Sequence, residues 1–549
     1  MNTRLSSAGF LVALCAVSAA APGCALLLGL DEFTDQPPGA GGSGGSGGAG
    51  GAGGSDVPLC TPAAQEACYA GPAATEGVGE CKAGIRTCPD DGAAWGACEG
   101  EVLPAVERCD ATADENCDSL DCIVWATAFE QDGTFEPNAI IGDPSGNVIV
   151  SGFFTGAIDI AGQNESSAGS TDGLMIKLGP AGEVLWARKI GDLFEDAIAA
   201  VATDDAGNIF IAGRTATAID FGAGVVPAGL YVAKLDPGGQ TLWSVGLGGD
   251  GYFVDITLDS AGNAVVAGFF SEPIDFGEGP VSPAGGTDIL VAKLDGENGA
   301  ISPPGSWVRT VGDAGNQLAL SVAVDGSDNV FVAGEFAGTI DFGGFGGQAT
   351  ANGVDGFLAK LTPAGSGSWL SRLGGAGEQQ AFGVAVDAAG RPAVVGEFDG
   401  SIDLPGVTLT SAGTKDAFAI QFSATKDVVW SKAFGDAANQ GARAAAMDSL
   451  GNLTLGGYAA GQIDLGAGPQ PAVGDIDAFV AKLSPDGNPL WSRLLGGVEE
   501  DVTWALALSP SDEVLTANTS REEAPDFGTG PLPSSPLATR RLVIAKLGR

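Results

Sequence analysis

The sequence predicts an all-β fold, and three observations lead to this prediction. A motif of about 60 residues recurs through positions 123–549, and each copy is marked by a tryptophan, at 125, 186, 243, 307, 369, 430 and 491. Each copy contains four short apolar segments separated by glycine-rich turns, which is typical of short strands. The last copy ends in LVIAKLGR and has no tryptophan segment after it. A lone tryptophan segment, IVWATAF at 123–129, stands before the first complete copy.

Together these observations predict a seven-bladed β-propeller over 123–549, with four strands in each blade. We expect the orphan segment 123–129 to supply the fourth strand of the last blade, because pairing the two ends closes the ring and hides exposed edges. A linear solenoid would instead carry polar caps. The preceding residues divide into a signal peptide (1–23), a lipid anchor and tether (24–56) and a cysteine-rich module (57–122).

Residues 1–23 have the features of an export signal, with one arginine, an apolar stretch and small residues before Cys24. APGC at 21–24 resembles a bacterial lipobox, which implies that Cys24 is lipidated and becomes the mature N-terminus; Cys15 is a weaker match. The alternative is an uncleaved membrane anchor, because the apolar run continues to Leu30. We expect an exported protein, anchored by lipid to the outer membrane or cell surface.

The segment GAGGSGGSGGAGGAGGS at 39–55 predicts a flexible tether. For a glycine-rich chain of this length the root-mean-square span is about 20–25 Å. We expect it to hold the folded part away from a membrane surface.

The module 57–122 contains eight cysteines, which predict a disulfide framework in an exported chain. Their pairing stays open, since eight cysteines allow 105 connectivities. The segments CYAGPAATEGVGECKAGIRTC, AAWGACEGEV and ERCDATADENCDSLDC resemble a module of surface lipoproteins from gliding, predatory Gram-negative bacteria. The eight are Cys60, Cys68, Cys81, Cys88, Cys98, Cys109, Cys117 and Cys122.

The end of this module contains an acidic motif that fits the first half of a calcium loop. Asp114, Asn116, Asp118 and Asp121 offer the hard oxygen ligands that calcium prefers. The glutamate that closes such a loop is missing, because Trp125 occupies its position. Calcium is therefore the one cofactor that the sequence indicates, and the alternative is an acidic linker held by disulfides.

The repeat itself resembles the bacterial β-propeller repeat called SBBP. The shared features are a D-x-x-G-N turn, an aspartate corner such as IDFG, the segment D-x-F-V-A-K-L and the tryptophan strand. The resemblance covers the seven units and implies a propeller in an extracytoplasmic protein, but no agreed reaction or ligand. The second copy lacks the aspartate before its third strand, and the fifth has IQF at 420–422 where others have AKL.

Composition excludes several classes of function. The chain has no histidine, which removes Ser-His-Asp and Cys-His catalysis and every histidine-ligated metal site. The formal net charge is −43, and such a field repels phosphate backbones, so we expect no nucleic-acid partner. We expect a monomer whose charge either concentrates cations or serves only to solvate its surface.

Three sets of residues recur at fixed positions, and we interpret them as structural. Lysines of the third strand need a carboxylate partner if they are half-buried, and we expect the corner aspartates to supply it. The aspartates of the D-x-x-G-N turn are expected to cap turn amides. The lysines are 177, 234, 293, 360, 482 and 546; the corner aspartates are 159, 220, 275, 341, 403, 464 and 526; the turn aspartates are 143, 204, 259, 325, 387 and 448.

The loops that join the fourth strand to the next blade, and the second strand to the third, vary most between copies. Both open on one face of a propeller, and variable loops on a rigid scaffold commonly carry recognition. We predict a binding face there with Glu195, Asp196, Asp250, Glu378, Gln379, Glu499 and Asp501. The plain alternative is a solvated rim.

We therefore expect a non-catalytic surface lipoprotein whose propeller binds an extracellular protein or polysaccharide. The alternative is a carbohydrate-active enzyme, a hydrolase or lyase, that uses acidic residues in the propeller mouth, since such chemistry needs no histidine. No pair of carboxylates stands out from the repeat in the sequence.

Overall fold

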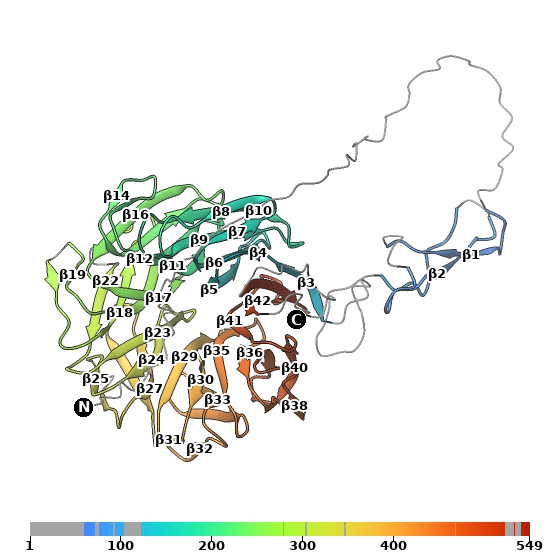
Figure 1. Cartoon of the computed structure of the whole chain (residues 1–549). Coiled ribbons are helices and arrows are strands. Elements are labelled where there is room, and N and C mark those ends of the chain that lie inside the picture. The colour runs from blue at the N-terminus through green and yellow to red at the C-terminus, as the bar shows by residue number, and fades with distance from the viewer. Residues whose placement is uncertain are drawn as a thin grey trace. The chain divides into compact units, whose positions relative to one another are not determined.

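A computed structural model shows an all-β protein (Figure 1). The structure describes residues 60–549 apart from 72–75, 92–93, 104–121, 278, 302–304, 345–346, 467, 522–526, 528–531 and 533–539. Seven four-stranded antiparallel sheets are arranged around an axis, which confirms the predicted propeller. We letter the strands of each blade A to D; strand A is innermost, and the A strands of neighbouring blades contact one another.

The first three blades follow one another along the chain. Blade 1 contains β5 (Phe135–Gly142), β6 (Val148–Phe154), β9 (Asp172–Leu178) and β10 (Val184–Ile190). Blade 2 contains β11 (Asp196–Thr203), β12 (Ile209–Thr215), β15 (Gly229–Leu235) and β16 (Thr241–Gly248). Blade 3 contains β17 (Gly251–Leu258), β18 (Ala264–Phe270), β21 (Asp288–Leu294) and β22 (Trp307–Val311).

The next three blades repeat this order. Blade 4 contains β23 (Gln317–Val324), β24 (Val330–Phe336), β27 (Asp355–Leu361) and β28 (Gly367–Leu373). Blade 5 contains β29 (Gln379–Val386), β30 (Pro392–Phe398), β33 (Asp416–Phe422) and β34 (Val428–Phe434). Blade 6 contains β35 (Gln440–Met447), β36 (Leu453–Ala459), β39 (Asp477–Leu483) and β40 (Pro489–Leu495).

Blade 7 is built from both ends of the propeller sequence. It contains β41 (Asp501–Leu508), β42 (Val514–Ser520), β43 (Arg541–Leu547) and, as strand D, β3 (Ile123–Ala128). β3 pairs with β43 so that Ile123 lies opposite Leu547 and Trp125 opposite Lys546. The orphan segment closes the ring as the sequence predicts.

The blades carry additional hairpins that the sequence did not indicate. They lie in the connection between strands B and C, where the corner aspartates stand, except for β4, which precedes strand A of blade 1 and pairs with β7. The strands are β7 (Ala157–Ile160) with β4 (Glu130–Gln131) and β8 (Gln163–Ser166), β13 (Ile219–Asp220) with β14 (Val225–Val226), β19 (Ile274–Asp275) with β20 (Pro280–Val281), β25 (Thr339–Asp341) with β26 (Gln348–Thr350), β31 (Ser401–Leu404) with β32 (Val407–Thr410), and β37 (Gln462–Asp464) with β38 (Pro469–Pro471).

The core lies between the blades. Strand C is buried along its whole length in every blade, because the neighbouring blades cover both of its faces. One apolar cluster, for example, joins Leu230 and Trp243 of blade 2 to Phe253, Val266 and Leu290 of blade 3. Continuous apolar runs such as LYVAKL suit this position, because an alternating pattern would bury polar side chains between the blades.

The buried lysines pair with a different aspartate from the one that the sequence suggested. Lys177 Nζ lies 2.9 Å from Asp143 Oδ2 and Lys482 Nζ lies 2.9 Å from Asp448 Oδ2; lysines 234, 293 and 360 pair likewise with aspartates 204, 259 and 325. These are the aspartates of the turn between strands A and B, so the prediction of the corner aspartates was wrong. The sequence concealed this because the two residues are about 35 positions apart and meet only when strands B and C pair.

The turn aspartates also cap their turns, as predicted. Asp448 Oδ1 accepts hydrogen bonds from the amides of Leu450 and Asn452 at 2.9 and 2.8 Å, and Gly451 adopts φ = 81°. Burial alone would raise the pKa of Asp448, but the hydrogen bonds from Asn452 and Lys482 outweigh it and hold that pKa below its ordinary value.

Blades 5 and 7 keep the ion pair, but in each of them one of its two members comes from a different sequence position. In blade 5, Gln421 replaces the lysine, and Arg391 contributes the cation to Asp387 from the position that asparagine holds in other copies, with Nε and Oδ2 2.6 Å apart. In blade 7, Ser509 replaces the turn aspartate, and Glu513 contributes the carboxylate to Lys546 at 2.7 Å. Each blade therefore contains one acid and one base at this place, although the residue positions differ.

The corner aspartates instead cap the hairpins in which they stand, at the surface. Asp275 Oδ1 accepts a hydrogen bond from the amide of Gly277 at 2.8 Å, and Asp464 Oδ1 does the same for Gly466 at 2.8 Å. Asp526 lies outside the described residues.

The tryptophans join neighbouring blades. Trp307 Nε1 donates to the carbonyl of Pro363, in the turn between strands C and D of the next blade, at 3.0 Å. Trp125, Trp186, Trp243, Trp369 and Trp430 make the equivalent bond. Trp491 precedes blade 7, whose strands C and D come from opposite ends of the chain and share no turn; its buried Nε1 has no hydrogen-bond partner among the described residues.

The cysteine-rich module contains a small two-stranded sheet, β1 (Gln65–Cys68) and β2 (Gly84–Thr87). Disulfides join Cys60 to Cys88 and Cys68 to Cys98. Cys81 and Cys122 are also disulfide-bonded, and Cys122 is buried against the core of blades 6 and 7. Cys109 and Cys117 lie outside the described residues.

Candidate functional site

The two faces of the propeller differ in how regular they are. The turns between strands A and B and between C and D lie on one side, which we call the AB/CD face. The loops from strand D to the next strand A and from strand B to strand C lie on the opposite side, which we call the DA/BC face. On this face Lys415, in a loop from B to C, forms a β-bridge with Asn439, in a loop from D to A. The ion pairs and tryptophan bonds described above recur on the AB/CD face. A site specific to this protein is therefore expected on the DA/BC face.

A β-bulge interrupts every strand A near its DA/BC end. Each bulge leaves one residue without a partner on strand B, and this residue differs in type from blade to blade. Bulges re-aim side chains and are common beside functional sites. The bulge residues are Asn138, Ala199, Val254, Leu320, Phe382, Arg443 and Trp504.

Three consecutive bulge residues, in blades 5 to 7, gather around a guanidinium group. Arg443 lies over the ring of Phe382 at 4.2 Å and within 5.8 Å of the ring centre of Trp504. Tyr458, from strand B of blade 6, is 5.2 Å from the same group. Such cation–π contacts hold the arginine in place while they leave its donors available for polar partners.

Glu397 is the polar centre of this group. Its carboxylate accepts hydrogen bonds from Lys415 Nζ at 2.5 Å and Tyr458 Oη at 3.0 Å, and Arg443 Nη2 lies 3.3 Å away. Only 4% of the Glu397 side chain is exposed. A buried carboxylate with three donors forms a rigid anchor for the side chains around it.

Glu335 occupies the same strand position in blade 4. Gln380 connects the two glutamates, since its Nε2 donates to Glu335 and its Oε1 accepts from Lys415 at 3.3 Å. Burial raises the pKa of Glu335, and the nearby charges of Glu378 and Glu397 add to that effect. We call the connected set the inner cluster; it comprises Glu335, Gln380, Phe382, Glu397, Lys415, Arg443, Tyr458 and Trp504.

A cavity of about 540 Å³ lies beside the inner cluster. Lys415, Thr414 and Asn439 line one side of it, and Asp399 with three glycines lines the rest. Glycines leave backbone groups accessible to a ligand, and the polar side chains offer both donors and acceptors. The cavity is suited to a hydroxyl-rich or amide-containing group.

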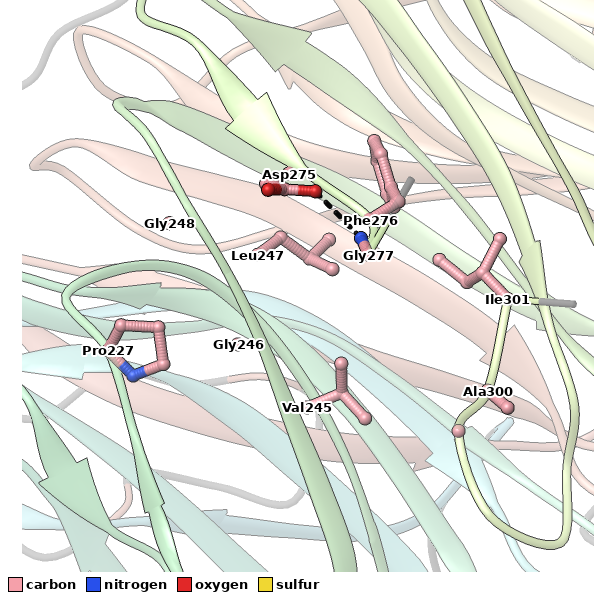
Figure 2. Close-up of a pocket in the computed structure, with 11 residues that line it drawn as sticks. Pro227, Val245, Gly246, Leu247, Gly248, Asp275, Phe276, Gly277, Ala300 and Ile301 are labelled. Carbon is pink, nitrogen blue, oxygen red and sulfur yellow. Dashed lines mark hydrogen bonds between the residues drawn. The ribbon is translucent and has the colours of Figure 1, made fainter. Parts of the chain in front are cut away.

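A second cavity, of about 650 Å³, is formed by β16 and the β19–β20 hairpin (Figure 2). Val245, Leu247, Phe276 and Ile301 give it a mostly apolar lining. Its one carboxylate, Asp275, is engaged by the amide of Gly277, as the dashed line in Figure 2 shows. This cavity presents no group of polar side chains that could perform chemistry.

Four of the seven residues predicted for the binding face are exposed on it: Glu195, Asp250, Glu378 and Glu499. Glu195 and Asp250 flank Arg214 of strand B in blade 2, at 3.9 and 3.0 Å from its guanidinium nitrogens. They therefore belong to a charged rim that joins blades 2 and 3.

The other three, Asp196, Gln379 and Asp501, are buried beneath the loops. Asp196 Oδ2 accepts from the amide of Asp192 at 2.9 Å, and Asp501 Oδ2 accepts from the amide of Gly497 at 3.0 Å. Gln379 Nε2 donates to the carbonyl of Ala376 at 2.9 Å. These three side chains shape the DA/BC loops from below.

Sequence reasoning singled out no member of the inner cluster, because most of them stand inside strands, where side chains ordinarily serve packing. The available signal was the glutamate in VAGEF and VVGEF of blades 4 and 5, at a position that holds other residues in the remaining copies. Arg443 could not be assigned to a bulge without knowledge of the pairing between strands A and B.

Several predicted residues lie outside the described part of the chain. These are Cys24 and the candidate calcium ligands Asp114, Asn116, Asp118 and Asp121. Among the described residues, no group of three or more cysteine, aspartate or glutamate side chains is placed to hold a metal ion. No helix within the same residues has the length and hydropathy of a membrane span.

No protein-family model and no curated protein matches the chain. Among solved structures it is similar to the WD40 domain of Neurospora crassa Pan2, at 9% identity and a TM-score of 0.40 over 76% of this chain and 95% of that one. It is also similar to proteins of unknown function from Bacteroides caccae (11% identity, TM-score 0.31, 58% and 89% covered) and Dyadobacter fermentans (11%, 0.32, 67% and 97%). Similarity at this level carries no inference about function, and the propeller is identified from its own blades.

Proposed function

We propose that this protein is a lipid-anchored surface protein with an SBBP-type propeller, whose DA/BC face binds an extracellular protein or polysaccharide. One observation carries the proposal. The seven copies agree on the AB/CD face, whereas charged and aromatic side chains specific to blades 4 to 7 converge on the DA/BC face as the inner cluster, beside a polar cavity. In a repeat protein, residues that only some copies carry are not needed to build a blade. Contacts among such residues therefore indicate a role other than architecture.

The composition of the site supports binding. Aromatic rings and a fixed guanidinium next to a polar cavity are common in surfaces that recognise hydroxyl-rich or peptide ligands. Both glutamates of the cluster are buried, and Glu397 is engaged by three donors. A carboxylate in that state orients its neighbours and does not reach a substrate.

A glycan array tests the polysaccharide side of this proposal. The purified full-length protein is applied to a broad array with calcium and again with a chelator, next to the Arg443→Ala and Lys415→Ala variants. Selective binding that both variants lose would support the inner cluster as the site. Binding that survives both substitutions would assign the ligand to another surface.

A second candidate is a carbohydrate-active enzyme, and one observation favours it. Glu335 and Glu397 are two carboxyl groups specific to blades 4 and 5, and the pKa of Glu335 is raised, as a general acid requires. New reducing ends, or unsaturated ends, released from a panel of polysaccharides would support this candidate if Glu335→Gln abolished them. The binding proposal predicts no release, and saccharide binding that Glu335→Gln retains.

A further inference from the structure

One rim position of the DA loops distinguishes two junctions between blades from the others. Three copies have alanine there: Ala314, Ala376 and Ala437. The loop between blades 1 and 2 has Leu193 and the loop between blades 6 and 7 has Val498, with 74% and 68% of their surfaces exposed. Phe194, directly after Leu193, is 55% exposed.

The BC loop beside the second junction shows the same substitution. Val473 is 70% exposed and stands where other copies have Ala168, Ala284 and Ala412. The positions are equivalent, because in each case the backbone amide donates to the aspartate that begins strand C. Three copies therefore form this loop with alanine, and most of the larger Val473 side chain is exposed.

The apolar residues stand together in pairs of loops. A Cβ on Gly474 would lie 2.5 Å from the carbonyl carbon of Val498, which places the loop of Val473 against that of Val498. A Cβ on Gly169 would likewise lie 2.4 Å from the carbonyl carbon of Leu193. We call Leu193 and Phe194 the first apolar tip, and Val473 and Val498 the second.

Other exposed apolar side chains have a different character. Leu185, Leu242, Val429 and Leu490 all precede the tryptophan of strand D, so they recur with the repeat and belong to its outer edge. The tips depart from the repeat on the DA/BC face. Single exposed apolar residues are ordinary on protein surfaces, whereas grouped ones on one functional face mark interaction sites.

Charge decides what the tips contact. Exposed acidic residues adjoin both of them: Glu195 follows Phe194, and Asp475 and Glu499 flank the second tip. With a net charge of −43, the chain repels anionic lipid, nucleic acid and a second copy of itself. A partner that complements these tips has apolar pockets bordered by lysine or arginine.

We propose that the two apolar tips dock a basic protein on the DA/BC face. The inference rests on the proposed function and selects a protein over a polysaccharide for this part of the face. Leucine and valine tips offer a saccharide no hydrogen bonds, whereas inserted into the pockets of a protein they supply the desolvated anchors that dominate such interfaces.

The test uses random peptides displayed on phage, selected on the full-length protein. Its variants are Leu193→Ser with Phe194→Ser, and Val473→Ser with Val498→Ser. The control is Leu450→Ser, since Leu450 is 78% exposed on the AB/CD face. We expect the wild type and the control to enrich peptides that combine lysine or arginine with large apolar residues. We expect the tip variants to bind the best such peptide at least about tenfold more weakly, and added salt to weaken binding to the wild type.

Three results would overturn the inference. Equal enrichment on wild type and tip variants would remove the tips from the interface. Enrichment of acidic peptides would contradict the predicted charge of the partner. Binding to anionic vesicles, or self-association, that the tip variants lose would give the tips another occupant. Saccharide binding that depends on Arg443 would leave the proposed function intact in all three cases, so the two failures are distinguishable. All four side chains are exposed, and unchanged circular dichroism would exclude misfolding as the cause.

Discussion

The two faces of this propeller use charged residues in opposite ways. On the AB/CD face, each blade pairs one acid with one base of its own, and a tryptophan hydrogen bond links every blade except the sixth to the next one among the described residues. On the DA/BC face, some ion pairs connect neighbouring blades; Arg540, just before strand C of blade 7, contacts Glu136 of blade 1 at 2.7 Å and Glu500 of the loop before blade 7 at 2.8 Å.

The comparison shows how a repeat separates architecture from recognition within one chain. Where the copies agree, a residue is needed by every blade, and the exchanges in blades 5 and 7 show that the charge pair is needed more than any given residue. In the inner cluster the copies differ in sequence, yet their side chains contact one another. The blade fold does not require these residues.

Removal of one buried cation should have the largest effect. Lys482→Gln leaves Asp448 buried without its base, and breaking a buried pair in this way costs about 3 kcal/mol of unfolding free energy. Denaturant unfolding would measure the loss. Lys432→Gln, at a half-exposed position of β34, is the control and should change stability by less than about 0.5 kcal/mol.

A second substitution should restore much of that stability. Asn452→Arg, added to Lys482→Gln, reproduces in blade 6 the arrangement that blade 5 has with Arg391 and Gln421. Rescue would show that the blade requires the charge pair itself. A double variant no more stable than Lys482→Gln alone would show that the surrounding side chains fix the lysine, and the exchange in blade 5 would then need another explanation.

Two kinds of aspartate should respond to pH with opposite signs. Against the effect of burial, hydrogen bonds from neighbouring side chains and amides lower the pKa of the turn aspartates 143, 204, 259, 325 and 448, so their contribution to stability is lost only as pH falls below about 3.8, the ordinary value. Asp255, near the axis, accepts hydrogen bonds from Ser321 Oγ and the amide of Val322, yet burial raises its pKa to about 6. Its protonated form is favoured in the folded state, so its contribution is complete below about pH 3.8 and is lost as pH rises through 6.

The Asp255→Asn variant isolates this effect. We expect the unfolding free energy of the wild type to fall by about 2 kcal/mol between pH 4 and 7 relative to the variant. Parallel pH profiles for the two proteins would contradict the raised pKa. Unfolding measured in denaturant at several pH values gives both curves.

The smallest effect concerns the tryptophan bonds. Trp307→Phe removes a hydrogen bond to Pro363, whereas Trp491→Phe removes none to any described residue, and both rings are buried. Because the loss of ring volume is the same, Trp307→Phe should cost about 1 kcal/mol more. Equal losses would mean that the tryptophans act through packing alone.

The fold could be predicted from the sequence because every blade repeats it. Seven copies of one pattern, and an unpaired strand at each end, define blade number and ring closure without any long-range information. The partners of the buried lysines could not be predicted, since Lys482 and Asp448 are linked only by strand pairing. The position of Arg443 in the inner cluster depends on the bulge that shifts the register of β35 between Ala442 and Ala444. Nothing in the residues of β35 indicates that the bulge lies there, so the cluster could not be predicted.

Ring closure has a mechanical consequence. β3 is both the strand that completes blade 7 and the strand through which everything before residue 123 is attached to the propeller. Tension applied to the preceding chain therefore enters the ring where no turn connects the two strands. It is borne by the ladder between β3 and β43, by buried Ile123 and by the bond from Trp125 to Pro180. This one strand is therefore the first part of the ring to carry such a load.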